Sequence, residues 1–380
     1  MKLIQLAALA AALVFSNLGY SATMAQVDDV RVTVLGDMTV SRWTHGEWGF
    51  SALVEVKING AWKKILFDTG AEPATVALNV DRLANLQKMK DASGNPLSVC
   101  DADTVVLSHN HQDHTMGLIE LRRRCQKTNP NALSTAYVGG PEIFWSRPYT
   151  TQFPSSTGRI DDNVMLAGNG IAKALGLDAE YDKMGVKGLY EATGAHFVIP
   201  QNKQPMELTG FPGVWITAGI PRIYDEKTYP GQPNFVDPST GKPSPDTVPE
   251  DQALVINTSK GLVVITGCAH AGVVNTALYA QKISNRPIYA LLGGYHLLQE
   301  KKGDVSTVGT LSWTAAQMAG MNITYLLGAH CTGLEAFAIL RDMLKMDSTH
   351  AVYSTIATVF DLTKGILPPS GLSLNSTPAP

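Results

Sequence analysis

The chain has 380 residues, of which 44% are hydrophobic and 17% are charged, and its formal net charge is −3. This length fits one large domain or two ordinary ones, and the apolar fraction is ample for a packed core. Charge this sparse and balanced excludes a polybasic surface, so we expect no nucleic-acid partner. Beyond residue 25, no stretch contains the roughly 18 apolar residues of a membrane span, so none is expected.

The first 25 residues have the pattern of an export signal. Lys2 is followed by an apolar run over 3–15, and small residues follow up to Ala25. A positive start, a short apolar core and a small residue before the cut are typical of a secretory signal peptide. An N-terminal anchor helix is the alternative, but the run is short for a span. We therefore expect cleavage near Ala25 and a periplasmic or secreted protein.

Four cysteines follow this signal, at Cys100, Cys125, Cys268 and Cys331. An exported protein can form disulfides, because the compartment is oxidising. Cys100 precedes one predicted strand and Cys125 ends the next predicted helix. The two either form a bridge or remain as buried thiols.

The first part of the chain predicts a β-hairpin, then two helices on either side of a buried strand. Asn59-Gly60 is a strong hairpin turn between two strand-like segments. Apolar side chains then recur at helical spacing, and the run DTVVL has the composition of a buried strand. In chain order these elements are a strand over 51–58, a strand over 61–67, a helix over 75–90, a strand over 103–107 and a helix over 116–124.

The middle of the chain, from about 139 to 250, is less regular and is rich in aromatic residues and proline. A long segment with little periodicity either builds a substrate-facing wall or lid or is a surface insertion. Its aromatic side chains either line a pocket or pack in the core, and core packing is the commoner role. The candidates for a pocket are Trp145, Tyr149, Phe153, Trp215 and Tyr224.

Regular spacing returns at Asp251 with a second hairpin, followed by alternating helices and strands. The order of the first part thus recurs, which predicts two sheets packed face to face with helices outside. We expect a single domain over 30–365 and a flexible tail over 366–380. The elements are two hairpin strands around the turn 259–261, a helix over 272–284, a strand over 287–292, a helix over 306–319, a strand over 323–327 and a helix over 333–344.

Histidine is concentrated where predicted strands end. Three histidines lie within six residues, and three more each follow an apolar strand that ends in glycine. Strand ends are where rigid scaffolds present ligands, and scattered structural histidines would not be expected at four of them. The first group is His109, His111 and His114, with Asp113 between them, and the second is His270, His296 and His330.

The spacing in the first group predicts metal binding. Residues two apart in extended backbone point the same way, so His109 and His111 can hold one ion. Asp113 and His114 follow as the chain turns into a helix and can hold a second. Imidazole and carboxylate suit zinc, and also iron or manganese. We expect one or two Zn2+ ions, about 3.5–4 Å apart when both are bound, with Mn2+ or Fe2+ as alternatives.

The motif SHNHQDH resembles the hallmark of the metallo-β-lactamase superfamily, which also contains glyoxalase II and many lactonases and phosphodiesterases. Phe67-Asp68-Thr69-Gly70 is similar to the first motif of that superfamily, whose aspartate orients a ligand histidine. The succession DQALVI, TGCAHAGVVNT, LLGGYH and GAHCTG is similar to a narrower subfamily, which is named after a dihydropterin-linked ribofuranosylaminobenzene 5′-phosphate synthase. The resemblance covers about 30–125 and 250–335.

This resemblance implies an α/β fold of the αββα type, a four-layer sandwich of two mixed sheets flanked by helices, with the metals at one edge. It places Asp68 behind His109 or His111. It also assigns metal ligands, which are His109 and His111 for metal one and Asp113, His114 and His330 for metal two.

The chain departs from the superfamily at two positions. Most members carry Gly-His-Thr before the second hairpin, where this chain has Thr247-Val248-Pro249-Glu250. His270 is therefore the expected substitute at metal one, and His196 is a weaker candidate. Where relatives place Asp or Cys at the end of that hairpin, Cys268 either binds metal two or is a small buried residue in a tight turn. His296 is either a ligand or a substrate-facing acid.

Three functions fit these features. The first is an exported metal-dependent hydrolase, in which a metal-activated hydroxide attacks an ester, lactone, amide or phosphoester of a small molecule. Asp113 would orient the nucleophile or take its proton, and His296 would donate to the leaving group. The second is group transfer of the synthase type, although an exported protein meets few pterin precursors. The third is a non-catalytic metal binder or sensor, which would not need Asp113.

Overall fold

The computed structural model describes residues 25–149, 160–161, 165, 179–226, 234–298 and 300–369. The predicted signal peptide lies outside the described residues except for Ala25, as do Phe153 and the tail from 370 onward. The helices within these ranges are all too short or too polar to cross a membrane.

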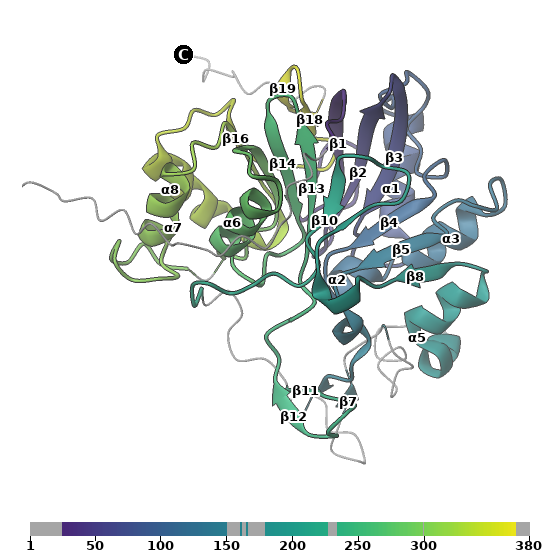
Figure 1. The fold of residues 1–380 in the computed structure, drawn as a ribbon. Helices are drawn as coiled ribbons and strands as arrows, with labels where there is room; N and C mark the ends of the chain where they lie inside the picture. The colour runs from purple at the N-terminus through teal and green to yellow at the C-terminus, as the bar shows by residue number, and fades with distance from the viewer. Residues whose placement is uncertain are drawn as a thin grey trace, which may run out of the picture.

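Two mixed β-sheets lie face to face, and helices cover the outer face of each (Figure 1). The strands of the first sheet, in spatial order, are β19 (Gly365–Leu367), β18 (Val359–Asp361), β1 (Asp29–Gly36), β2 (Ser51–Ile58), β3 (Ala61–Phe67), β4 (Thr104–Leu107), β5 (Thr135–Val138) and β8 (His196–Val198). Those of the second are β17 (Ala351–Tyr353), β16 (Tyr325–Gly328), β15 (Ile288–Gly293), β14 (Gly261–Thr266), β13 (Ala253–Thr258), β10 (Val214–Ile216) and β9 (Met206–Glu207).

The helices divide between the two sheets. On the side of the first sheet lie α1 (Thr75–Asn85), α3 (Leu118–Cys125) and α5 (Ala179–Ala192). On the side of the second lie α6 (Val273–Ser284), α7 (Leu311–Ala319) and α8 (Leu334–Leu344). Two small hairpins extend from one end of the sandwich, formed by β6 (Pro148–Tyr149) with β7 (Ile160–Asp161) and by β11 (Asn234–Val236) with β12 (Pro243–Pro245).

Three apolar clusters fill the spaces between these four layers. The central cluster joins inward-facing residues of both sheets, such as Val54 of β2 and Ile265 of β14. The other two lie beneath the helices, where Leu83 of α1 and Phe337 of α8 are examples. Because each sheet is covered on both faces, the strands β4, β13 and β14 are buried along their whole length, as their apolar runs predict.

The first hairpin shows how local sequence sets strand pairing. Asn59 and Gly60 have φ angles of 51° and 81°, the left-handed pair that a two-residue hairpin turn requires. β2 and β3 then pair antiparallel between the bounds predicted from the sequence, which are confirmed. The end of β3 brings Asp68 to the edge of the sheet.

The carboxyl ends of the parallel strands of both sheets meet at one edge. β3 and β4 run parallel in the first sheet, and β14, β15 and β16 run parallel in the second. Gly267 after β14 approaches Ser108 after β4 so closely that a Cβ on Gly267 would lie 2.0 Å from the Ser108 Oγ. Only glycine permits this close approach. It brings the segment after β14 next to the segment after β4.

The segment 139–250 contributes more to the sheets than its sequence indicates. β8 extends the first sheet, and β9 and β10 extend the second, so the segment is more than a surface insertion. These strands have only two or three residues, too few to show a periodicity. Two of the predicted pocket aromatics pack in the protein, Trp145 against Phe235 and Tyr224 against Trp313.

Other sequence-based boundaries need small corrections. The helix predicted over 75–90 ends at Asn85, and the one predicted over 306–319 begins at Leu311. β19 ends at Leu367, two residues beyond the predicted end of the domain. Of the two outcomes left open for Cys100 and Cys125, the structure has the disulfide.

Candidate metal centre

The loop after β4 presents the clustered histidines. His109 and His111 lie between the end of β4 and the short helix α2 (Gln112–Thr115), which contains Asp113 and His114. His109 and His114 are fully buried, whereas the Asp113 side chain is 14% exposed. Asp113 and the partly exposed His111 are therefore the members of the group that solvent can contact.

Three histidines from distant parts of the chain bring ring nitrogens together, and we call them the first triad. The Nε2 atom of His109 is 2.9 Å from the Nδ1 atom of His111, and the Nε2 atom of His270 lies 3.2 Å from both. Tetrahedral ligands 2.0–2.1 Å from zinc lie about 3.3 Å from one another. The three nitrogens therefore have the spacing of ligands around one ion. His270, which follows β14, completes this triad, as expected of a substitute for the Gly-His-Thr histidine.

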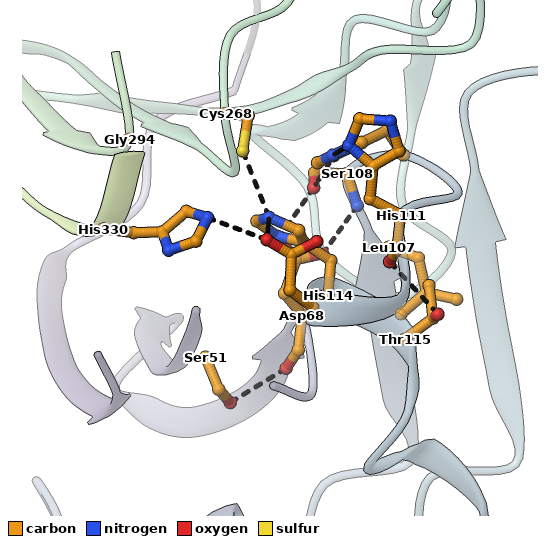
Figure 2. A network of polar contacts seen from close by, with 12 residues as sticks. Ser51, Asp68, Leu107, Ser108, His111, His114, Thr115, Cys268, Gly294 and His330 are labelled. Carbon is orange, nitrogen blue, oxygen red and sulfur yellow. Dashed lines mark hydrogen bonds and ion pairs between the residues drawn. The ribbon is translucent and has the colours of Figure 1, made fainter. Parts of the chain in front are cut away.

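Asp113, His114 and His330 form a second triad beside the first. The Oδ2 atom of Asp113 lies 3.1 Å from the Nε2 atom of His330 and 3.7 Å from the Nε2 atom of His114. The Cys268 thiol is 3.2 Å from the His114 Nε2 atom, and its sulfur also lies within 4.8 Å of a His109 ring nitrogen. Figure 2 shows Cys268 and His330 pointing toward His114 from different sides.

The donor atoms of the two triads fit one or two zinc ions. Five imidazoles and one carboxylate are ligands that zinc accepts, and manganese and iron accept them too. Each triad offers three protein ligands, which leaves a coordination position for water or substrate. Catalytic zinc sites keep such an open position, whereas structural sites close all four.

Asp68 supports the triads from behind. Its Oδ2 atom lies 2.7 Å from the Nδ1 atom of His114 and accepts from the Ser108 hydroxyl, also at 2.7 Å. That hydroxyl in turn lies 2.8 Å from the Nδ1 atom of His109. The sequence-based expectation of a direct contact with His109 or His111 is thus corrected, because the direct partner is His114 and Ser108 relays the contact to His109. The reason is the turn into α2, which brings His114 back over the end of β3.

Strained backbone is concentrated around the triads. Asp68, Ala269, His296 and His330 have φ angles of 53°, 55°, 50° and 46°, in the left-handed region that residues other than glycine seldom adopt. Each such residue costs on the order of 1–3 kcal/mol, and such residues occur preferentially at functional sites. Two of these four supply imidazoles to the cluster. The fold therefore holds these rings in place at some cost in stability.

The two triads differ in their protonation when no ion is bound. Burial and the neighbouring imidazoles lower the pKa of His109 and His270 well below its ordinary value, and burial lowers the pKa of His111 to about 4. Burial would also lower the pKa of His330, but the Cys331 and Asp113 side chains raise it to about 9. At neutral pH the first triad is therefore neutral, whereas His330 must lose a proton before it can bind a cation.

Asp113 has an ionised side chain at neutral pH. Burial would raise its pKa, but the His114 and His330 rings hold it below the ordinary value. Burial likewise opposes protonation of His114, yet the carboxylates of Asp113 and Asp68 raise the pKa of that ring. The second triad is thus an ionic cluster in which a cation can replace the imidazole protons.

Two supporting groups were missed from the sequence. His330 is held by Asp37, which accepts from its backbone N–H at 3.1 Å, and by the Tyr353 hydroxyl, which donates to its carbonyl at 2.9 Å. Asp37 offers a weak signal, since it is an acidic residue directly after the buried run of β1. Tyr353 gives none, because its partner cannot be inferred from local sequence.

A buried ionic cluster supports the loop between His109 and His111. Arg147 donates to Asp246 at 2.7 Å and to both oxygens of Glu250 at 2.9 and 3.0 Å, and all three side chains are almost fully buried. In the orientation that satisfies its hydrogen bonds, the Asn110 amide donates to Glu250 and accepts from Arg147. Glu250 ends the segment in which the resemblance predicted Gly-His-Thr, and its carboxylate forms an ion pair with Arg147. Asp246 and Glu250 lie 99 and 103 residues from Arg147 in the sequence, so no local pattern predicts these ion pairs.

The remaining candidate residues divide into two groups. The ring of His296 lies 4.5 Å from that of His270, and Cys268 lies beside both triads, so both residues belong to the cluster. His196 is exposed at the edge strand β8, where it pairs with Thr135. Trp48, which the sequence did not single out, is half-exposed and its ring centroid lies 5.3 Å from that of His330.

Comparison with known proteins finds similar sequences and a solved structure of similar architecture. No protein-family model matches the chain. It is 28% identical over 342 residues to the 7,8-dihydropterin-6-methyl-4-(β-D-ribofuranosyl)-aminobenzene-5′-phosphate synthase of Methanocaldococcus jannaschii, an alignment that covers 85% of this chain and 95% of the relative. An uncharacterized protein of the same archaeon is 24% identical over 312 residues, which is 82% of this chain and 94% of that protein.

A solved structure shares the architecture. The crystal structure of a metal-dependent hydrolase of the β-lactamase superfamily aligns with a TM-score of 0.58 at 21% identity, covering 87% of this chain and 98% of that one. The four-layer sandwich is therefore the metallo-β-lactamase fold, and the predicted fold class is confirmed. The resemblance to the superfamily, and within it to the subfamily named after the dihydropterin-linked synthase, is confirmed as well.

Proposed function

We propose that the protein is a metal-dependent hydrolase that acts on an ester, lactone, amide or phosphoester bond of a small molecule. The observation that supports this most strongly is the pair of adjacent triads, each with three ligand atoms at the spacing of one ion. When bound, zinc ions lower the pKa of water and polarise a carbonyl or phosphoryl oxygen. Mn2+ or Fe2+ would supply the same chemistry with these ligands.

Asp113 is the residue to which we assign the proton transfer. Its carboxylate is ionised and is the only partly exposed group of the two triads apart from His111, among the residues the structure describes. It can accept a hydrogen bond from an attacking water molecule and then take its proton. A site that only stored metal would not need an exposed, ionised carboxylate at this point.

The surroundings of the second triad support a substrate with an apolar or ring-shaped part. Trp48 offers a half-exposed indole, 52% accessible, next to His330. An indole at this distance can pack against an acyl chain or a ring while the reacting bond lies over the triads.

Group transfer of the synthase type is the second candidate, and the 28% identity to the dihydropterin-linked synthase favours it. The predicted export signal argues the other way, because an exported protein meets few pterin precursors. Mass analysis of the products formed from a phosphoribosyl substrate and a dihydropterin distinguishes group transfer from hydrolysis. A product that joins both substrates indicates transfer, and addition of water alone indicates hydrolysis.

The test of the proposal is a chelator-sensitive activity screen of the zinc-loaded protein on a lactone, a phosphodiester, a thioester and a β-lactam. We expect hydrolysis of at least one substrate and a loss of about 10²–10⁴-fold in Asp113→Ala, the range for removing a general base. Full activity of a metal-loaded Asp113→Ala protein would refute the role of Asp113. No hydrolysis of any substrate by metal-replete protein would favour a non-catalytic metal binder.

A further inference from the structure

We propose that Asn275 and Arg222 are positioning residues for His270, the histidine that completes the first triad. The proposal rests on the metal centre of the proposed function, because it concerns the support of one of the ligands there. Neither residue was singled out from the sequence. Both act on the backbone of the loop 267–272, which joins β14 to α6, and through this backbone they set the place of the imidazole.

The loop needs such support because its backbone is strained at Ala269. The φ angle of Ala269 is 55°, in the left-handed region. Strained backbone keeps its conformation only where its surroundings determine it. Relaxation of Ala269 would rotate the neighbouring peptide and move the His270 ring, whose Nε2 atom lies 3.2 Å from each of its two partner nitrogens in the first triad. The ligand geometry therefore depends on what holds this loop.

Three side chains hold the backbone directly after the His270 Cα atom. The Arg222 guanidinium donates to the His270 carbonyl. The Ala271 N–H donates to the Asp251 carboxylate at 2.8 Å, and the Ala271 carbonyl accepts from the Asn275 amide at 2.7 Å. Three successive polar groups of the main chain thus have a side-chain partner, so a shift of the loop would break at least one of these bonds.

Asn275 also fastens a second segment, 222–226, against the loop. Its amide oxygen accepts from the Ile223 and Tyr224 N–H groups at 3.0 and 2.9 Å, and its NH2 group donates to the Tyr224 carbonyl at 2.9 Å. The side chain is fully buried, so loss of the amide would leave these backbone groups without a partner. The segment carries the guanidinium described above. Asn275 therefore supports the loop both directly and through this segment.

Glu226 closes the segment at the start of α6. Its carboxylate accepts from the Val274 and Asn275 N–H groups at 3.2 and 2.8 Å, as the capping side chain of a helix does. Gly272 precedes the helix and has no side chain that could cap it, and a Cβ there would lie 2.3 Å from the Glu226 Oε1 atom. Glycine thus leaves room for a cap from another part of the chain. The segment 222–226 is therefore anchored at both of its ends.

The test measures Zn2+ affinity at each triad by chelator competition in Asn275→Ala. The His330→Ala background leaves the first triad, and the His270→Ala background leaves the second. We expect a loss of about 10–100-fold at the first triad, the range for groups that orient a metal ligand, and no comparable loss at the second. With Co2+ bound at the first triad, the visible absorption should change as well, because the His270 ring no longer keeps its place among the ligands.

Asn79→Ala is the matched control. Asn79 is also a fully buried asparagine whose amide holds backbone, since it donates to the Leu35 and His45 carbonyls at 3.0 and 2.9 Å and accepts from the His45 N–H at 2.8 Å. The control should lower the free energy of unfolding without a loss of Zn2+ affinity at the first triad. If Asn275→Ala does not fold, Arg222→Ala decides the test, because Arg222 is exposed and its removal should cost about tenfold at the first triad.

Unchanged affinity at the first triad in folded Asn275→Ala would overturn the proposal. So would an equal loss at both triads, an equal loss in Asn79→Ala, or a first triad that binds no Zn2+ in the His330→Ala background. The hydrolase proposal is judged separately by turnover. Zinc bound at both triads without turnover would count only against the hydrolase, and turnover with unchanged affinity in Asn275→Ala would count only against the role of Asn275.

Discussion

Removal of the Asp68 charge should weaken the second triad more than the first. Asp68 is fully buried and contacts three donors, which are the Ser108 N–H, the Ser108 hydroxyl and the His114 Nδ1 atom, each at 2.7 Å. In Asp68→Asn the amide has one acceptor oxygen, and its NH2 group must face at least one of these donors. The negative charge that favours the ligating form of His114 is also lost.

The expected magnitude follows from comparable supporting contacts. Mutation of a group that orients a metal ligand typically costs 10–100-fold in metal affinity, or about 1.4–2.7 kcal/mol. We expect this loss at the second triad, where the contact with Asp68 is direct. At the first triad the contact passes through Ser108, so the loss should be smaller. The free energy of unfolding should fall by about 1–3 kcal/mol, because a buried donor loses its partner.

The assay measures Zn2+ affinity by chelator competition for each triad alone. A His270→Ala background leaves the second triad, and a His330→Ala background leaves the first. Ser108→Ala is the matched control, since it breaks the relay to His109 and spares the contact between Asp68 and His114. It should weaken mainly the first triad. Unchanged affinity at the second triad in folded Asp68→Asn would refute this assignment.

Two further predictions concern protons and packing. From pH 8 to pH 6 the Zn2+ affinity of the second triad should fall about a hundredfold or more. The His330 pKa of about 9 lies above this range, so its displaced proton costs tenfold per pH unit, and the raised pKa of His114 adds to the loss. The Zn2+ affinity of the first triad should change little over this range, since the pKa of His111 is about 4. Chelator competition at pH 8 and pH 6, in the His270→Ala and His330→Ala backgrounds, checks both expectations. An equal dependence of affinity on pH in the two backgrounds would contradict them. In Gly267→Ala the new Cβ would lie 2.0 Å from the Ser108 Oγ and 2.7 Å from the Asp68 Oδ2. We therefore expect the free energy of unfolding, measured by urea denaturation, to fall by about 1–3 kcal/mol, and the metal content to fall as well. Gly320→Ala, whose Cβ has no neighbour nearer than 3.4 Å, is its control, and equal stability of the two variants would be evidence against the close approach.

Much of the fold could be predicted because its long elements carry strong local signals. The Asn59-Gly60 turn and the apolar runs beside it define β2 and β3, and glycine after the runs of β15 and β16 marks where those strands end. The short strands β8, β9 and β10 could not be predicted, because they are held by pairing with distant strands rather than by their own periodicity.

The candidate site was predictable as far as residue types and strand ends define it. His109, His111 and Asp113 are close in sequence, and the strand-end rule placed His270 and His330 at the same edge. The rule could not show which ring Asp68 contacts, because this depends on how α2 turns back over β3. Nor could it pair Arg147 with Glu250, since a buried ion pair between remote residues has no local pattern.

The most direct test of the metal centre is a crystal of the full chain grown with Zn2+ and measured at the zinc absorption edge. The structure predicts anomalous peaks about 2.0–2.1 Å from the ring nitrogens of His270 and His330, and two peaks about 3.5–4 Å apart if both triads are filled. Zinc bound only at other residues, with no peak at either triad, would contradict the proposed function of this protein.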